Sequence, residues 1–124
     1  MRPSVNTQEG VFTPDNLFGG DFPVVTDTVT IAQSAALKRG AVLGKVTATA
    51  KYVLSEAAAG DGSENPVAIL AEDIDATDAD VTAPVYLTGE FNARALQLGD
   101  GHTIDSVKEA LRPLSIFIKD TVGA

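Results

Sequence analysis

Between residues 42 and 54 the side chains alternate in character, and this pattern constrains the fold more than any other feature of the sequence. Every second residue is apolar or small: Val42, Gly44, Val46, Ala48, Ala50, Tyr52 and Leu54. Polar residues lie between most of them: Lys45, Thr47, Thr49 and Lys51. A period of two is that of a β-strand with one buried and one solvated face. We therefore expect one long strand here, or two strands joined by a bend at Gly44.

Shorter patterns indicate further strands, at residues 25–31, 66–71, 85–91 and 114–118. In the third of these, Phe91 shares the apolar face with Val85 and Leu87, which predicts that its ring lies in the core. The segments between the strands are expected to be irregular: a loop at 55–65, an acidic stretch at 72–84, and one or two helical turns at 92–98.

One helix is predicted near the C-terminus. Thr103 is a suitable N-cap, and Ile104, Val107 and Leu111 recur after it at helical spacing. Pro113 follows where the helix must end. The chain of 124 residues shows neither an internal repeat nor a second domain. The sequence therefore predicts a mainly β domain with one short C-terminal helix and an extended N-terminal arm.

The composition indicates a globular chain without disulfides. Hydrophobic residues make up 44% and aromatic residues 6%, with no Cys and no Trp, so the core must consist mainly of Val, Ile, Leu and Ala. The net charge is −8. Because phosphate backbones and anionic lipids repel such a surface, we expect no direct nucleic-acid binding and no membrane association. The N-terminus lacks the apolar region of a signal peptide, which predicts synthesis in the cytoplasm without export.

Residues 1–23 differ from the rest of the chain. They are rich in Gly, Pro and Asn, yet they carry three of the five Phe residues: Phe12, Phe18 and Phe22. A solvated tail has little use for aromatic side chains. Two interpretations stay open. The segment wraps over its own core, or it is an arm that is mobile until it docks on a partner.

Three candidate chemical sites are weak. The stretch Gly40–Lys45 has three rather than four residues between its glycines, and Val46 stands where a phosphate-binding loop needs Ser or Thr. The acidic run 73–80 lacks the central Gly and terminal Glu of a calcium loop. His102 is the only histidine and lies beside a Gly-Asp-Gly turn, where a loop role is usual. We therefore expect no catalytic residues, no metal ligands and no cofactor.

Several stretches follow one another in an order that matches a known family. They are FTPDNLFGGDFP (12–23), RGAVLG (39–44), GDGS and PVAIL (60–63 and 66–70), VYLTGEFN (85–92) and the segment 111–118. Each stretch alone is unspecific, but the combination spans nearly the whole chain from Phe12 onward. In this combination the sequence resembles the head decoration proteins of lambda-type tailed phages.

The resemblance implies a β-clip-like fold and a structural role in the virion. It implies homotrimers on the outer surface of the expanded phage head, at threefold and quasi-threefold positions, which stabilise the shell against the pressure of packaged DNA. The implied partners are the major capsid protein and further copies of the chain.

The resemblance also implies a division into a capsid-docking arm (1–23) and a decoration domain (24–124). The residues implied to dock are Phe12, Pro14, Asp15, Asn16, Leu17, Phe18, Gly19, Gly20, Asp21 and Phe22. Those implied to maintain the fold are Gly40, Gly44, Ile69, Leu70, Tyr86, Gly89, Phe91 and Ile116.

Two rival functions remain at this stage. The first is a nucleotide hydrolase of β-clip architecture, which would need a substrate motif that the sequence does not contain. The second is another inert β-rich virion component, such as a tail or fibre protein. The place of the protein in the particle distinguishes the second rival from a decoration protein.

Overall fold

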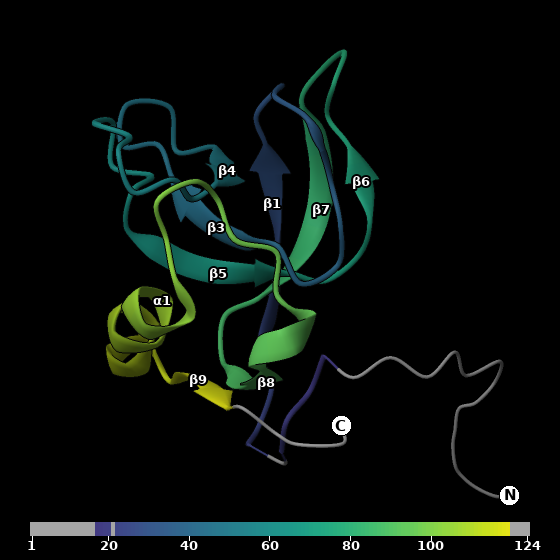
Figure 1. Ribbon diagram of the computed structural model, residues 1–124. Helices are drawn as coiled ribbons and strands as arrows, with labels where there is room; N and C mark the ends of the chain where they lie inside the picture. The colour runs from purple at the N-terminus through teal and green to yellow at the C-terminus, as the bar shows by residue number, and fades with distance from the viewer. Residues whose placement is uncertain (1–16, 21, 120–124) are drawn as a thin grey trace, which may run out of the picture.

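The computed structural model describes residues 17–20 and 22–119 (Figure 1). In chain order its elements are β1 (Thr26–Ile31), β2 (Ala36–Leu37), β3 (Val42–Lys45), β4 (Tyr52–Leu54), β5 (Pro66–Leu70), β6 (Ile74–Asp75), β7 (Val81–Tyr86), β8 (Gly89–Asn92), the 3-10 turn η1 (Ala93–Ala95), α1 (Ile104–Leu111), the 3-10 turn η2 (Arg112–Leu114) and β9 (Ile116–Lys119). The fold is mainly β with a single short α-helix near the C-terminal end of the described chain, as the sequence predicts.

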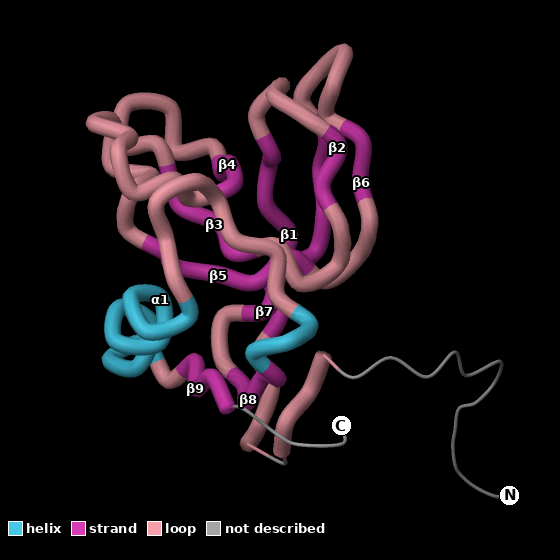
Figure 2. Tube along the Cα trace, in the orientation of Figure 1, coloured by secondary structure: helices cyan, strands magenta, loops and turns pink. Residues whose placement is uncertain are grey.

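Five strands close a barrel in the order β1-β4-β3-β5-β7. Neighbouring strands are antiparallel except β1 and β4, which meet in parallel at Ile31 and Tyr52. Two short sheets lie outside the barrel: β2 pairs with β6, and β8 pairs in parallel with β9. In Figures 1 and 2 the barrel forms one end of the molecule, and α1, β8 and β9 form the other. Because a closed barrel has no open strand edges, its strands offer little for edge-to-edge association.

Two hydrophobic cores lie on opposite sides of β3 and β5. Leu43 and Leu70 point into the barrel core. Val42 and Ile69 point into a second core, which we call the lower core and which lies between these strands and the layer of α1, β8 and β9. All four side chains are at most 1% exposed. A strand that is buried on both faces reads as a continuous apolar run rather than as an alternating one, which explains the sequence Pro66–Leu70.

The predicted long strand at 42–54 is wrong, because the chain folds back on itself within it. Strands β3 and β4 form an antiparallel pair in which Leu43 lies opposite Leu54. The chain reverses between them, where the N–H of Val46 donates to the carbonyl of Lys51 (2.8 Å) and Ala50 adopts a positive φ of 61°. The turn, residues 46–51, contains neither Gly nor Pro. It is supported from outside by the N–H of Thr47, which donates to the carbonyl of Asp61 (2.9 Å).

Gly44 marks a close approach rather than the predicted bend. A β-carbon at this position would lie 1.9 Å from the carbonyl oxygen of Ser63, so no larger residue fits without moving the backbone. The same carbonyl accepts the hydroxyl of buried Ser55 (2.7 Å). The absence of a side chain at Gly44 thus lets the loop 55–65 pack directly on β3.

The predicted single strand at 85–91 is also wrong. Strand β7 ends at Tyr86, and β8 begins at Gly89 in a different sheet. The chain bends at Leu87 and Thr88, where the N–H of Leu87 donates to the carbonyl of Val25 (2.7 Å). As a result Val85 lies in the barrel core and Phe91 in the lower core, although both are buried as predicted.

Two smaller differences concern the flanks of predicted elements. The stretch 72–84, expected to be irregular, contains β6 and most of β7, because pairing with β1 extends β7 back to Val81. Leu114, assigned to the last strand, lies in η2 and is 41% exposed. The predicted helix is confirmed. Thr103 caps α1 through a reciprocal pair of hydrogen bonds with Ser106, at 3.0 and 3.2 Å.

We expect Phe91→Ala to lower the free energy of unfolding by about 3–5 kcal/mol, because it empties a fully buried aromatic site. Urea denaturation measures the effect. Phe117→Ala is the matched control, since that ring is only partly buried and should cost less. A loss below about 1 kcal/mol for Phe91→Ala would contradict the position of this ring in the lower core.

We expect Leu17→Ala to lower the free energy of unfolding by about 2–5 kcal/mol, because this side chain is 1% exposed and belongs to the lower core. The same denaturation experiment tests it. A curve identical to that of the parent protein would contradict the position of the Leu17 side chain in the lower core.

Candidate functional site

The N-terminal segment enters the domain along β8. The carbonyl of Leu17 accepts the N–H of Asn92 (2.6 Å), and the N–H of Gly19 donates to the carbonyl of Glu90 (2.8 Å). Between these bonds Phe18 forms an antiparallel bridge with Phe91. Residues 17–19 therefore occupy the edge of β8 that β9 leaves free, and Leu17 is the first described residue that is fixed in the core.

An aromatic cluster built around Arg39 surrounds this entry point. The ring of Phe18 lies 5.2 Å from that of Tyr86 and 5.5 Å from that of Phe91, measured between centroids. The guanidinium of Arg39 lies 5.5 Å from the ring centroids of both Phe18 and Tyr86. One of its nitrogens donates to the Tyr86 hydroxyl and to the carbonyl of Ala71, each at 2.7 Å. These contacts hold Phe18 in place although its side chain is 39% exposed.

A second set of contacts fixes the chain after it turns back from β8. The hydroxyl of Thr88 donates to the carbonyl of Pro23 (2.8 Å) and accepts the N–H of Val25 (3.0 Å). The ring of Phe22 meets that of Phe117 edge-on, with the centroids 5.1 Å apart. The segment 22–25 is thus bound to both the β7–β8 bend and β9.

Of the two interpretations of residues 1–23, the one in which the segment wraps over its own core holds for Leu17 and Phe18. They pack on the domain, so the packed core begins before the predicted boundary between residues 23 and 24. Gly19, Gly20 and Phe22 follow them along the same surface. The remaining members of the predicted docking set lie outside the described residues: Phe12, Pro14, Asp15, Asn16 and Asp21.

The residues that the resemblance assigned to the fold are distributed over both cores. Leu70 lines the barrel core, while Ile69, Phe91 and Ile116 line the lower core. Tyr86 is partly buried against the lower core, and Gly89 begins β8. Gly40 adopts a positive φ of 100° in the turn before β3, where a β-carbon would lie 2.3 Å from the carbonyl oxygen of Ala95.

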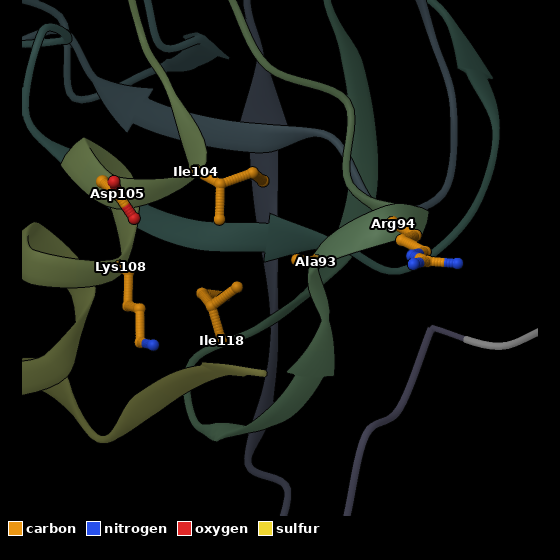
Figure 3. A pocket seen from close by; sticks show the side chains of 6 residues that line it. All are labelled: Ala93, Arg94, Ile104, Asp105, Lys108 and Ile118. Carbon is orange, nitrogen blue, oxygen red and sulfur yellow. The ribbon is translucent and has the colours of Figure 1, made fainter. Parts of the chain in front are cut away.

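A pocket of about 400 Å³ opens between η1, α1 and β9 (Figure 3). Ala93, Ile104 and Ile118 form its apolar lining, and the side chains of Asp105 and Lys108 lie at the helix side. Arg94 stands at the opposite side. The charged groups are of both signs and are spread around the rim. The pocket therefore lacks the convergent polar groups that fix the orientation of a small ligand.

His102 and Ser55 form a pair that resembles part of a hydrolytic site. The Nε2 atom of His102 lies 3.0 Å from the Ser55 hydroxyl and 3.1 Å from the carbonyl of Glu64. However, Ser55 is fully buried, and its hydroxyl donates to the Ser63 carbonyl. The other ring nitrogen of His102 faces the hydroxyl of Ser106 (3.1 Å), where a catalytic triad has a carboxylate. The pair joins the loop 55–65 to the start of α1 and does not form a triad.

The acidic run at 73–80 uses its carboxylates within the fold. Asp80 accepts the N–H of Gln33 (2.8 Å) and the ammonium of Lys51 (2.6 Å), and these hydrogen bonds hold the pKa of Asp80 below its usual value. Hydrogen bonds from Thr77 likewise lower the pKa of Asp75. Within residues 17–20 and 22–119, no group of three or more His, Cys, Asp or Glu side chains could hold a metal ion.

Sequence reasoning did not identify Arg39 and Thr88 as residues that position the N-terminal segment. Arg39 and Thr88 appeared only within the stretches 39–44 and 85–92 that carry the family resemblance, without a role of their own. The aromatic residues Phe18 and Phe22 carried the available signal, because aromatic side chains in a breaker-rich segment require packing partners. None of the helices in the described part of the chain has the length and apolar character needed to cross a bilayer.

Comparison with known proteins identifies the family. A search of curated proteins found no match. The family model for bacteriophage lambda head decoration protein D matches residues 6–117, which include all the elements described above except the end of β9. The match thus covers the packed domain and part of the N-terminal segment that precedes Leu17. On this match the chain belongs to the family of bacteriophage lambda head decoration protein D, whose members are structural components of the phage head.

Proposed function

We propose that this protein binds as homotrimers to the outer surface of the expanded phage head, at threefold and quasi-threefold positions, and stabilises the shell against the pressure of packaged DNA. The family match over residues 6–117 carries this proposal. The proposed partners are the major capsid protein and further copies of this chain, and the proposed location is the exterior of the virion.

The physical character of the domain supports a mechanical role. A closed barrel and a second core form a compact block, and His102 uses both ring nitrogens in contacts within the fold. The net charge of −8 favours solubility at the high concentrations that precede assembly, and it disfavours binding to DNA. A clamp needs rigidity and a binding surface rather than reactive groups.

We propose that the docking arm consists of residues 1–16, with Leu17 as its anchor. Because Leu17 is fixed in the lower core, an arm of this length reaches at most about 53–58 Å from the domain. It contains Phe12, Pro14, Asp15 and Asn16 from the predicted docking set. In a trimer three such arms leave one rigid body, so each contact raises the effective concentration of the next.

Deleting residues 1–16 should spare folding and weaken attachment to the head by at least about tenfold, because Leu17 is the first described residue of the core. Thermal melting of the truncated chain and its binding to expanded, undecorated heads measure the two effects. The matched control is a deletion of residues 1–20, which also removes Leu17 and Phe18 and should lower the melting temperature. Full attachment of the shorter deletion would show that the arm does not contribute.

Light scattering on the purified full chain should show trimers at high concentration if the trimer forms before attachment. A chain that remains monomeric at every concentration would contradict a preformed trimer.

Electron microscopy of decorated particles tests where the protein lies on the virion. Density on the tail alone, with a bare head, would favour a tail or fibre component.

A further inference from the structure

The tripeptide Gly-Asp-Gly occurs twice in the chain, at residues 60–62 and 99–101. An Asp-Gly pair can rearrange chemically, because glycine has no side chain that would hinder attack by its own amide nitrogen. The nitrogen attacks Cγ of the preceding Asp, a C–N bond forms, and the amide proton leaves with the carboxyl OH as water. The product is a five-membered succinimide ring.

Water then opens this ring at one of its two carbonyl groups. One opening restores Asp, and the other gives isoaspartate, in which the main chain runs through the β-carbon and is one atom longer. The two tripeptides are identical, so a difference in their reactivity has to come from the surrounding structure.

The first tripeptide is restrained by four hydrogen bonds. One carboxylate oxygen of Asp61 accepts the N–H of Ser63 (3.0 Å) and its hydroxyl (2.6 Å). The N–H of Gly62, which would be the nucleophile, donates to the carboxylate of Glu64 (2.8 Å). The carbonyl of Asp61 accepts the N–H of Thr47 (2.9 Å). The bonds from Ser63 also hold the pKa of Asp61 below its usual value, which lowers the fraction of the neutral carboxyl group that ring closure needs.

The second tripeptide has far fewer restraints. Asp100 and Gly101 are both exposed. Across the described part of the chain, no group donates to the Asp100 carboxylate and none accepts the N–H of Gly101. The carbonyl of Asp100 accepts the N–H of Ala57 (2.9 Å). Because ring closure moves the carboxylate, the N–H and the carbonyl of the pair, it breaks one hydrogen bond here and four at the first tripeptide.

We propose that Asp100 is a site of spontaneous isoaspartate formation in the folded protein, whereas Asp61 is protected from it. Water is the only other reactant, since the ring closure releases one molecule and the opening consumes one. The inference goes beyond the proposed function and does not depend on attachment to the phage head.

The modification should also weaken the fold, because the altered residue lies two positions before His102. That histidine joins Ser55 to Ser106 through its two ring nitrogens, at 3.0 and 3.1 Å. A main chain that is one atom longer at Asp100 displaces the ring from these partners. Isoaspartate at this position should therefore loosen the link between the loop 55–65 and the start of α1.

The experiment follows both tripeptides while the full chain ages in heavy-oxygen water at neutral pH. Each opening of the ring places one solvent oxygen in the product, so mass spectrometry counts the events. Digestion in ordinary water after Lys51, Arg94 and Lys108 puts Asp61 and Asp100 in separate peptides, 52–94 and 95–108. Because three more hydrogen bonds must break at Asp61, the label should enter Asp100 at least about tenfold faster in the folded protein. In the chain unfolded by urea the two rates should be similar.

Equal labelling of the two sites in the folded protein would overturn the inference. Absence of label at Asp100 in the folded chain, while the unfolded chain takes it up, would overturn it as well. Ser63→Ala is the matched variant, because it removes the hydroxyl that donates to Asp61. Labelling at Asp61 should rise in this variant, and labelling at Asp100 should stay as in the parent.

The effect on the fold is tested with Asp100→Glu, whose longer side chain would have to close a six-membered ring and does so much more slowly. The melting temperature of the parent protein should fall as isoaspartate accumulates, and that of the variant should stay constant. An equal fall in both proteins would contradict the link between this modification and stability.

Discussion

The architecture depends on the burial of both faces of β3 and β5. These strands lie between the barrel core and the lower core, and neighbouring residues along each strand alternate between the two. A change at Leu43 or Leu70 therefore acts on the barrel, whereas a change at Val42 or Ile69 acts on the layer formed by α1, β8 and β9. The two halves of the molecule are coupled because they share these strands. Such coupling suits a domain whose proposed task is to resist deformation.

The lower layer is completed by the chain that leads into the domain. The parallel pair β8–β9 is too small to form a stable sheet alone, and Leu17 and Gly19 extend it by hydrogen bonds to the free edge of β8, with Phe18 bridging to Phe91 between them. Arg39, held by Tyr86 and the Ala71 carbonyl, closes the aromatic cluster over this edge. The entry of the N-terminal segment is consequently a rigid point, so force on the preceding residues is transmitted to the core at Leu17.

The polar contacts of the domain serve to join loops. His102 and Ser55 connect the loop 55–65 to the cap of α1, and Asp80 connects Gln33 to Lys51. Ser, His and Asp side chains form catalytic sites in other proteins. Here Ser55, His102 and Asp80 make hydrogen bonds within the fold.

The sequence alone determined the elements whose signal is local. The N-cap at Thr103 with helical spacing after it specified α1, and the continuous apolar run at 66–70 specified β5. The burial of Phe91 also followed from its place in an alternating run. Only the tertiary structure decided where alternating runs are interrupted. The turn after β3 contains no Gly or Pro and is supported by the distant carbonyl of Asp61, and the bend after β7 is held by Val25. Leu17 likewise joins the core through an edge of β8 that no local pattern reveals, because period and propensity report on near neighbours whereas these contacts join residues far apart in the chain.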